Sequence, residues 1–600
     1  MKTRSLLIAV ILILINSVSY SQVLNETAIF SPGGTDPVDP WNIAHNEYNG
    51  QYAYVKYDAL MNLYSVVYEG KESGKFGYIS NYDIKFDTKG NYYVLATEYT
   101  DPDTYTYEYV LLVNGDSIGS YKYAEPYNAM VTKNDEYRFT ARTGEGEDSK
   151  TKIMTYSVSG GMRESEEYLL VKPIYKGDYP LDYGEGDVPY TNLFLDKNGN
   201  PGYVVLDGIN ASLMFGDNMT RTDYTDIDAN TFVYDKNGNM CYIAKNGAEF
   251  YTAPGNEFLV QGSQQHAAFD YVYGPVLFTS NNTPVYMGGE ALVDMVSNYF
   301  VIVGDEKQEV YMDAGKSLKA ERLSGGIYDL QVDANDNVSY YGTIYNEAPE
   351  TKEGPNSKTA FIVNGIASKF YVGMGMWKAS GDQVLVSYSP GNDYFTSALV
   401  HMTGGDEKVI FDKPGYSVQD YGFTPDGKIY YVTMKEGDYD TKVKPTYSIY
   451  LDGIKIGDYE MVLFEGTGMN TGMMQFSKRG DYAFAASTFN YYEEGKDIVQ
   501  NYAYVITNKG KQDPQILMGN SAEDFDYIES MFYSSNDRLF YIGGINDYAK
   551  NVYYSEVIVD GVNLGKSYTG LSNVKYDEVS NSVSFLASRD GTIYRVSVSL

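Results

Sequence analysis

The chain alternates between short apolar runs rich in tyrosine and short polar turns, and this alternation recurs along its length. One motif consists of an apolar residue, a turn containing Asp, Asn or Gly, and a second apolar run. Its clearest copies lie at residues 86–92, 195–200, 234–239, 332–337, 423–428 and 476–481. Weaker copies lie at residues 48–50, 131–137, 278–285, 377–384, 533–540 and 576–583, which makes about twelve. The pattern predicts repeated β-hairpins and no helix of note.

A second motif follows the first in several repeats and places Asn-Gly or Asp-Gly after an apolar run. Its copies lie at residues 111–115, 204–208, 361–365, 449–453 and 557–561. These dipeptides favour the two-residue type I′ hairpin, which needs a positive φ at both central positions. Two hairpins per repeat predict four antiparallel strands, A to D. The first motif would be the A–B turn and the second the C–D turn.

The repeat length and one closely matching copy point to a known architecture. The first motif recurs every 40 to 63 residues, with several gaps of 43 to 46, the length of a propeller blade. Residues 423–432 (Phe-Thr-Pro-Asp-Gly-Lys-Ile-Tyr-Tyr-Val) resemble the repeat of bacterial TolB-like, WD-like β-propellers, and residues 449–453 resemble its second half. The resemblance implies four-stranded blades and partner binding, without a shared catalytic residue. The Gly-His and Trp-Asp pairs of eukaryotic WD repeats are missing.

About twelve blades exceed the four to eight of a usual ring. We therefore expect two tandem propellers, residues 22–320 and 321–600, divided at the polar segment 316–326. One large ring is the alternative. The last repeat ends in a third strand at residues 593–600, and residues 27–30 could supply a closing strand.

The N-terminus has the pattern of an export signal. Lys2 and Arg4 precede an apolar run from Leu6 to Ile15, and small residues end at Ser21. We expect residues 1–21 to be removed and the protein to be exported, to the periplasm, the cell surface or the medium. The apolar run is too short for a comfortable membrane span. No cysteine follows it that could carry a lipid anchor, and no later segment is predicted to cross a membrane.

Composition narrows the partners. Asp and Glu number 80 against 46 Lys and Arg, a net charge of −34, which argues against nucleic acid and anionic lipid as partners. The 64 tyrosines suit strands and contact surfaces. The single cysteine, Cys241, excludes an intrachain disulfide, and its apolar surroundings predict a buried structural thiol.

The antiparallel alternation predicts two unequal faces. The A–B and C–D turns share one face, and the B–C and D–A connections, with nearly all the long insertions, share the other. Binding residues are expected on these longer loops, although solvated loops of a tyrosine-rich protein would look the same. The candidate residues are Tyr99, Asp101, Asp103 and Tyr105 in a B–C loop, Tyr175, Asp178, Tyr179, Asp182 and Tyr183 in a D–A segment, and Tyr491 and Tyr492 in a B–C loop.

Motifs for catalysis and metal binding are weak. His45, His266 and His401 show no metal-ligand spacing, and residues 561–567 have three residues between glycines where a phosphate loop needs four. The Asp-Lys-Asn-Gly-Asn turns lack the distal glutamate of a calcium loop, so we expect no cofactor. Calcium remains an option, for example at Asp223, Asp226 and Asp228.

Three functions are compatible with these features. The first is an exported, non-enzymatic binding or scaffolding protein that holds a protein or glycan with its long-loop face. The second is a glycan-active hydrolase or lyase that uses acidic residues of a central channel. The third is a structural surface protein that binds calcium. Absence of a catalytic signature favours the first.

Overall fold

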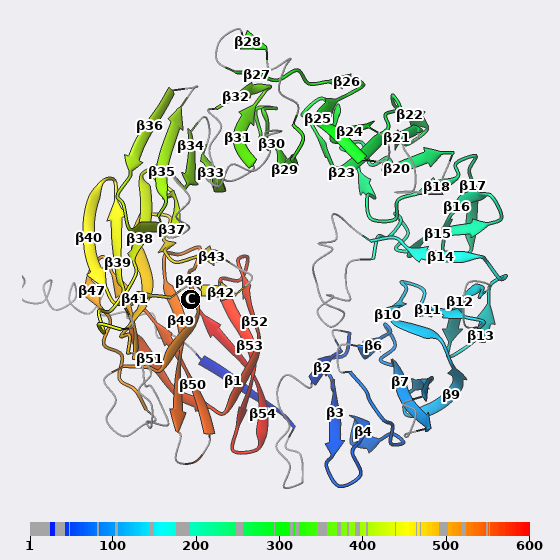
Figure 1. Ribbon diagram of the computed structural model, residues 1–600. Coiled ribbons are helices and arrows are strands. Elements are labelled where there is room, and N and C mark those ends of the chain that lie inside the picture. Colours follow the sequence, from blue (N-terminus) through cyan, green and yellow to red (C-terminus); the bar gives the residue numbers. More distant parts are fainter. Residues whose placement is uncertain are drawn as a thin grey trace, which may run out of the picture. The chain divides into compact units, whose positions relative to one another are not determined.

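A computed structural model shows an all-β chain, as the repeats predicted (Figure 1). It describes residues 24–30, 43–46, 48–80, 83–101, 106–144, 149–175, 193–247, 256–292, 295–312, 316–317, 323–345, 357–368, 374–380, 383–389, 396–403, 406–438, 440–463, 465–467, 470–490, 502–517, 524–547, 550 and 552–600. Over these residues the strands form twelve sheets of four or more strands and one two-stranded hairpin. We call the twelve larger sheets blades 1 to 12 in chain order.

Contacts group the chain into two units. The N-terminal unit comprises residues 42–374 and 389–392, and the C-terminal unit comprises residues 1–41, 375–388 and 393–600. The predicted boundary near residue 320, and the number of rings, stay predictions. Each unit is described by itself.

The N-terminal unit contains blades 1 to 7, coloured from blue to green in Figure 1. Its strands are β2 (Ile43–His45), β3 (Tyr52–Asp58), β4 (Leu63–Tyr68) and β5 (Lys71–Glu72) in blade 1; β6 (Lys85–Phe86), β7 (Tyr92–Asp101), β8 (Thr106–Val113) and β9 (Asp116–Tyr121) in blade 2; β10 (Ala124–Val131), β11 (Tyr137–Arg142), β12 (Thr151–Ser157) and β13 (Gly161–Glu164) in blade 3; β14 (Leu170–Pro173), β15 (Gly202–Asp207), β16 (Asn210–Phe215) and β17 (Asn218–Arg221) in blade 4; β18 (Asp226–Ile227), β19 (Val233–Tyr234), β20 (Met240–Asn246), β21 (Asn256–Gln261) and β22 (Gln264–Gln265) in blade 5; β23 (Tyr271–Phe278), β24 (Pro284–Leu292), β25 (Met295–Val303) and β26 (Glu306–Lys307) in blade 6; and β27 (Tyr311–Met312), β28 (Lys316–Ser317), β29 (Gly326–Val332), β30 (Val338–Tyr345), β31 (Ser357–Val363) and β32 (Ile366–Ala367) in blade 7.

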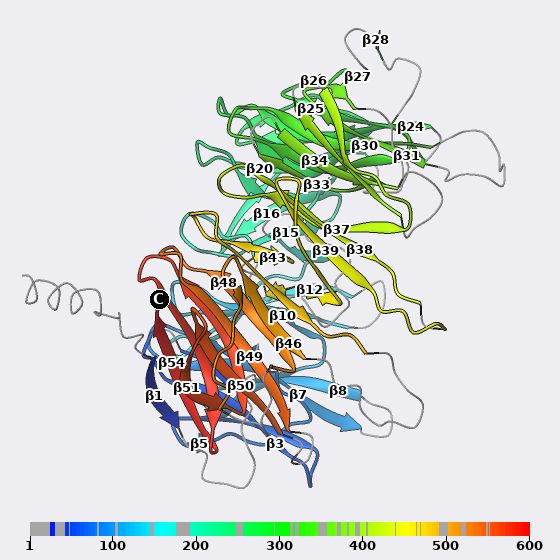
Figure 2. The same ribbon diagram turned by 90° about the vertical axis from the view of Figure 1, so that its left-hand side faces the viewer.

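The C-terminal unit contains blades 8 to 12, and Figure 2 shows its yellow, orange and red strands. They are β33 (Met374–Ser380), β34 (Gln383–Tyr388), β35 (Ala398–Thr403) and β36 (Asp406–Phe411) in blade 8; β37 (Tyr416–Phe423), β38 (Ile429–Lys435), β39 (Thr446–Leu451) and β40 (Ile454–Tyr459) in blade 9; β41 (Met461–Val462), β44 (Gln475–Phe476), β45 (Tyr482–Ser487), β46 (Ala503–Thr507) and β47 (Gly510–Lys511) in blade 10, beside the hairpin of β42 (Glu465–Thr467) and β43 (Asn470–Gly472); β48 (Tyr527–Tyr533), β49 (Leu539–Asp547), β50 (Val552–Val559) and β51 (Val562–Tyr568) in blade 11; and β52 (Gly570–Asp577), β53 (Ser582–Arg589), β54 (Thr592–Ser599) and β1 (Leu24–Phe30) in blade 12.

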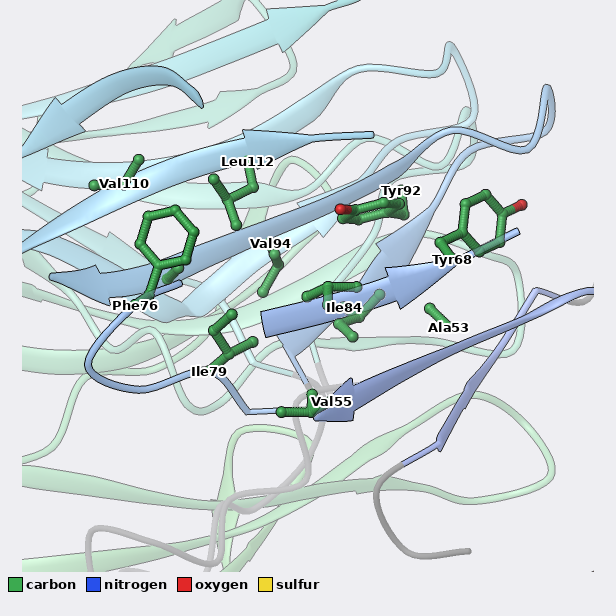
Figure 3. Close-up of a cluster of buried hydrophobic side chains, with 12 residues drawn as sticks. Ala53, Val55, Tyr68, Phe76, Ile79, Ile84, Tyr92, Val94, Val110 and Leu112 are labelled. Carbon is green, nitrogen blue, oxygen red and sulfur yellow. The ribbon is translucent and has the colours of Figure 1, made fainter. Parts of the chain in front are cut away.

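Neighbouring blades bury apolar side chains against each other. Between blades 1 and 2 the cluster includes Val55, Phe76, Ile79 and Val94 (Figure 3), and similar clusters join the other blades. A blade cannot bury both of its faces alone, so stacked blades are the stable arrangement. The fold is therefore a β-propeller of four-stranded antiparallel blades, which confirms the predicted fold class.

The last blade takes its fourth strand from the start of the chain. β1 pairs antiparallel with β54, as expected for the closing segment. Glu26 of β1 accepts hydrogen bonds from Arg589 at 2.6 and 3.0 Å and from the Tyr568 hydroxyl at 2.7 Å. Burial of Glu26 raises its pKa, but these bonds outweigh it and hold the pKa below the ordinary value. Polar contacts as well as the strand ladder therefore hold the closing strand.

The A–B turns follow one chemical rule. In four copies, the first turn residue is an aspartate that accepts the N–H groups two and four residues later and the amide of the fifth residue, an asparagine. These bonds measure 2.7 to 3.0 Å at Asp87, Asp196, Asp235 and Asp333. The carboxylates of the Asp-Lys-Asn-Gly-Asn motif thus serve the turn itself, as turn chemistry predicts.

The fourth turn position links successive blades. It has a positive φ, and glycine occupies it in several blades, among them at Gly90 and Gly199. Elsewhere Asp or Asn occupies it and accepts the N–H of the second turn residue of the preceding blade. Asp135 accepts from Thr88 at 2.9 Å, Asn282 from Lys236 at 2.8 Å, and Asp537 from Lys478 at 2.7 Å.

The second motif gives C–D turns in four of its five copies. Both central residues have a positive φ in the turns at residues 114–115, 364–365, 452–453 and 560–561, as a type I′ turn requires. The prediction was wrong for residues 207–208, which join β15 to β16 and so form a B–C turn. There only Gly208 has a positive φ, because Asp207 continues the extended strand.

Candidate functional site

Exposed tyrosines gather where the B–C and D–A connections of blades 1 and 2 lie. We call this end of a blade the long-loop face and the end with the A–B and C–D turns the short-turn face. Tyr57 near the end of β3 lies opposite Tyr64 at the start of β4. Their ring centroids are 4.9 Å apart at 40°. Tyr78, in the D–A connection, meets Tyr64 edge-on at 5.5 Å and 74°.

Blade 2 extends this aromatic group. Tyr99 on β7 lies opposite Tyr107 on β8. The Tyr99 ring lies across the backbone of Gly77, because a Cβ at Gly77 would be only 2.2 Å from Cδ2 of Tyr99. Because Gly77 has no side chain, the Tyr99 ring can occupy this space and extend toward blade 1. We call Tyr57, Tyr64, Tyr78, Tyr99 and Tyr107 the tyrosine surface.

The tyrosine surface is accessible. Tyr57, Tyr78, Tyr99 and Tyr107 are 43 to 50% exposed, and Tyr64 is half-buried. Partial burial raises the pKa of Tyr64, and the neighbouring phenols of Tyr57, Tyr78 and Tyr99 raise it further. The phenol groups of Tyr57, Tyr64, Tyr78 and Tyr99 therefore lie close enough to influence one another. Tyr57 donates to Asn62 at 2.8 Å. Half-exposed tyrosines offer a large apolar area and a polar group at low entropic cost, which suits macromolecular contacts.

The backbone beneath the tyrosine surface is held firmly. Residues 76–78 bridge two blades, because Phe76 pairs with Tyr64 of β4 and Tyr78 pairs with Thr97 of β7. The four N–H to carbonyl bonds measure 2.8, 2.8, 3.2 and 2.8 Å. Phe76 itself is buried in the cluster of Figure 3, with Ile79 close to it. The rings are therefore carried by a rigid base, as a preorganised contact surface requires.

An apolar hairpin tip adjoins the tyrosine surface. Leu60 and Met61 occupy the β3–β4 turn and are both exposed, Leu60 by 99%. The Asp58 carboxylate accepts the N–H groups of Leu60 at 3.1 Å and Met61 at 3.2 Å. Asp58 also pairs with Lys75 at 2.5 Å, and this bond lowers the pKa of Asp58. The tip is thus a fixed turn that presents two apolar side chains to solvent.

The structure describes three of the predicted site residues in whole or in part. Tyr99 is in the tyrosine surface. Asp101 ends β7, with its backbone opposite Thr106. Tyr175 pairs with Leu193 in another blade. The remaining predicted residues, Asp103, Tyr105, Asp178, Tyr179, Asp182, Tyr183, Tyr491 and Tyr492, lie outside the described residues.

The predicted D–A assignment of the segment from Tyr175 was wrong. The first strand of blade 4 is β14, which ends at Pro173 and pairs with β15. Tyr175 and the segment after it therefore follow strand A instead of preceding it. The turn motif at residues 195–200 marks only the end of this A–B connection, so it did not reveal that strand A lies before Tyr175.

Sequence reasoning missed most of the tyrosine surface. Tyr57, Tyr64 and Tyr78 lie in blade 1 and its connection to blade 2, where the turn motif is weakest. A signal was present, since Tyr52, Tyr54 and Tyr57 precede the hairpin and Tyr64 follows it. Only the fold shows that the connection carrying Tyr78 brings them to Tyr99.

Two of the three aspartates considered for calcium, Asp226 and Asp228, lie among lysines. Lys245 and Glu257 are buried and form an ion pair at 3.1 Å. Asp226 is opposite Lys245 in the strand register and lies 3.5 Å from Lys172. Burial raises the pKa values of Asp228 and Glu257. Within the described part of the chain, no three His, Cys, Asp or Glu side chains are grouped closely enough to hold a metal ion. Calcium binding stays a prediction.

Asp83 is a buried acid on the strand A side of blade 2. Its Oδ1 has no hydrogen-bond partner among the described residues. Burial raises its pKa to about 6, against the opposing effect of Lys85. Cys241 is buried, as predicted, and burial raises its pKa to about 12. A thiol in this state is a poor nucleophile at neutral pH.

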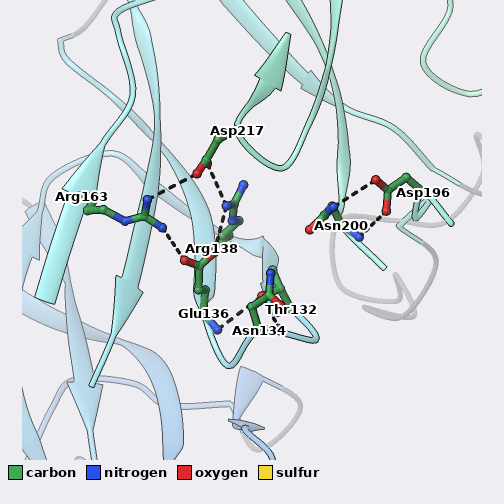
Figure 4. Close-up of polar contacts among 8 residues, drawn as sticks. All are labelled: Thr132, Asn134, Glu136, Arg138, Arg163, Asp196, Asn200 and Asp217. Atoms are coloured by element: carbon green, nitrogen blue, oxygen red, sulfur yellow. Dashed lines mark hydrogen bonds and ion pairs between the residues drawn. The ribbon is translucent and has the colours of Figure 1, made fainter. Parts of the chain in front are cut away.

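The short-turn face has a different character, seen in Figure 4. Arg138, which is almost fully buried, contacts Glu136 at 3.0 Å and Asp217 of blade 4 at 2.9 Å. Arg163 bonds to the same two carboxylates. These charges neutralise one another across blades 3 and 4 and contribute to joining the two blades.

Comparisons with known proteins add no function. No family model and no curated protein match the sequence. Among solved structures, a eukaryotic initiation factor aligns at 11% identity and a TM-score of 0.29, over 70% of this chain and 95% of that one. The β-propeller domain of the Trilobed protease from Pyrococcus furiosus aligns at 10% identity and a TM-score of 0.19, over 63% and 96%. A protein of unknown function from Bacteroides caccae aligns at 14% identity and 0.19, over 38% and 78%. Similarity this low carries no argument, so the class rests on the chain's own blades.

No helix in the described part of the chain has the length and apolar character needed to cross a membrane.

Proposed function

We propose that this protein is an exported, non-enzymatic binding protein that holds a macromolecule, protein or glycan, outside the cytoplasm. The tyrosine surface is the observation that carries the proposal. It combines half-exposed rings, a rigid base and a place at the B–C and D–A connections of blades 1 and 2. The leader-like segment 1–21 supports export.

The chemistry of the tyrosine surface suits binding better than catalysis. A hydrolase needs an acid and a second carboxylate or base at short separation. The tyrosine surface itself consists of aromatic rings, and two of the charged groups at its side, Asp58 and Lys75, are paired with each other. Rings of this kind supply contact energy without a reacting group.

Retention of ligands by the purified chain from residue 22 onward tests the proposal. The probes are an extract of the envelope of cells that export the protein and a panel of soluble and insoluble glycans. The variant Tyr78→Ala/Tyr99→Ala removes two rings of the tyrosine surface. Tyr48→Ala is the matched control, because Tyr48 is an exposed tyrosine at the A–B turn of blade 1.

We expect wild type and Tyr48→Ala to retain the same ligand and the double variant to lose it by at least about tenfold, as for central interface aromatics. Equal retention by all three proteins would contradict the assignment of the site. Cleavage of a glycan by the wild-type chain would favour the hydrolase or lyase instead.

A further inference from the structure

The hairpin tip of blade 1 differs from the exposed turn residue Val579 in what surrounds it. Val579 is a useful contrast, since it is 98% exposed and its N–H donates to Asp577 at 2.9 Å. Leu60 stands in the same kind of turn, two residues after Asp58. However, Val579 has Glu578 and Ser580 as its neighbours in sequence, whereas Leu60 is followed by Met61 and flanked by the paired Tyr57 and Tyr64. A single exposed aliphatic residue is ordinary, but a contiguous apolar group indicates an interaction site.

The shape of this group limits what can cover it. The tip ends a hairpin, so Leu60 and Met61 protrude, and a complementary surface must be concave and apolar. The adjacent rings are not coplanar, because Tyr57 and Tyr64 are inclined at 40° and Tyr64 and Tyr78 at 74°. Stacking of a linear glycan would need several free ring faces in one plane. Tilted rings around an apolar tip instead fit a partner pocket that receives the tip and whose walls contact the rings.

Charge also limits the partner. The carboxylate and ammonium at the base of the tip, Asp58 and Lys75, neutralise each other. The chain as a whole carries a net charge of −34, which opposes approach to an anionic bilayer. A protein pocket lined by apolar side chains satisfies both the shape and the charge of the tip.

We propose that Leu60 and Met61 insert into an apolar pocket of a protein partner and that the tyrosine surface forms the collar around this contact. The inference rests on the proposed binding function and adds the class of partner. The Asp58 turn keeps the tip in its bound shape beforehand, which lowers the entropic cost of insertion. The collar rings exclude water from the contact, as the rim of an interface does around its central residues.

Site-specific photo-crosslinking in cells that export the protein tests the inference. A p-benzoyl-phenylalanine probe replaces Leu60 in one protein and Val579 in the matched control. We expect position 60 to give one discrete crosslinked protein and position 579 to give none of it. In a binding assay with that crosslinked protein, Leu60→Asp should weaken retention at least tenfold, and Val579→Asp should leave it unchanged. Both replaced residues are fully exposed, so circular dichroism should show the same fold for all variants.

Two further probes separate failure of the inference from failure of the proposed function. Vesicles of zwitterionic phosphatidylcholine that float with wild type but not with Leu60→Asp would overturn the protein pocket in favour of a bilayer. Loss of glycan retention in Tyr78→Ala/Tyr99→Ala but not in Leu60→Asp would overturn the inference and keep the binding function. If neither variant changes any retention, both the inference and the assigned site fail.

Discussion

The two ends of the blades in the N-terminal unit use polar chemistry in opposite ways. At the short-turn face, Asp235 accepts hydrogen bonds from the backbone and from the side chains of Asn239, Gln261 and Asn282 at 2.7 to 2.9 Å. These bonds outweigh burial and hold the pKa of Asp235 well below its usual range. At the long-loop face, four tyrosine rings are half-exposed. At the short-turn face the polar groups therefore bond to other groups of the protein, whereas at the long-loop face the tyrosine side chains are open to solvent.

Buried acids extend the same contrast. Asp83 lies at the start of strand A, toward the long-loop face, and Glu257 lies in the second half of blade 5 near the same face. Burial raises both pKa values. Glu257 is paired with Lys245 at 3.1 Å, whereas Oδ1 of Asp83 has no hydrogen-bond partner among the described residues. A carboxyl group with a strongly perturbed pKa is a candidate for a functional site. Under the proposed function, stability and binding would be assigned to separate ends of the same blades.

The largest effect is expected at the short-turn face. Asp235→Ala leaves its hydrogen-bond donors without their acceptor, so it should lower the free energy of unfolding by about 3 kcal/mol at pH 7. Because the folded pKa of Asp235 is lowered, its contribution is present above the ordinary carboxyl pKa and is lost as pH falls toward the folded value. Denaturant unfolding at pH 7 and pH 3 should show the difference from wild type shrinking in acid. Asp207→Ala, at an exposed turn, should change little at either pH.

Removal of the buried carboxylate of Asp83 should raise the free energy of unfolding, whereas removal of Asp235 lowers it. The raised pKa of Asp83 means that its charged form costs stability above pH 6 and that this cost disappears as pH falls below the ordinary value. Asp83→Asn should therefore raise the free energy of unfolding by about 1–2 kcal/mol at pH 8 and by nothing at pH 3. Thermal unfolding at both pH values measures this. A loss of stability at pH 8 would show that Asp83 has a partner essential to the fold.

The link between blades 2 and 3 should be weaker than the turn itself. Asp135 has a φ of 59° and accepts from Thr88 N–H at 2.9 Å and Thr88 Oγ1 at 2.7 Å. Asp135→Gly keeps the backbone conformation but removes the link, and should cost about 1–2 kcal/mol. Asp135→Asn keeps an acceptor and should cost less. Hydrogen exchange at the Thr88 amide should rise in the glycine variant, and equal protection in both variants would argue against the link.

The smallest effect on stability, and the largest on binding, is expected at the tyrosine surface. Gly77→Ala would displace the Tyr99 ring without removing it, because the added Cβ occupies its place. The free energy of unfolding should fall by no more than about 1 kcal/mol. Retention of the ligand should nevertheless drop toward that of Tyr99→Ala. Unchanged retention in Gly77→Ala would show that the position of this ring does not matter.

Much of the fold was predictable because turns are local. The Asn-Gly and Asp-Gly dipeptides and the Asp-x-x-Gly-Asn pattern act within a few residues, so the hairpins followed from sequence. The exceptions had non-local causes. Asp207-Gly208 resembles a C–D turn but joins strands B and C, because β14 had already taken the place of strand A. Tyr99 was identified as a contact residue, but its partners were not, since Gly77 and Tyr78 reach it only through blade stacking.

The amino-acid sequence alone determined the class of fold and the four-stranded unit, because both rest on short-range backbone preferences and strand alternation. Tertiary structure decided which side chains meet. It joined β1 to β54 across nearly the whole chain, and it gathered the tyrosines of blades 1 and 2 beside the Leu60 tip. Such meetings depend on how blades stack, which local propensity does not encode.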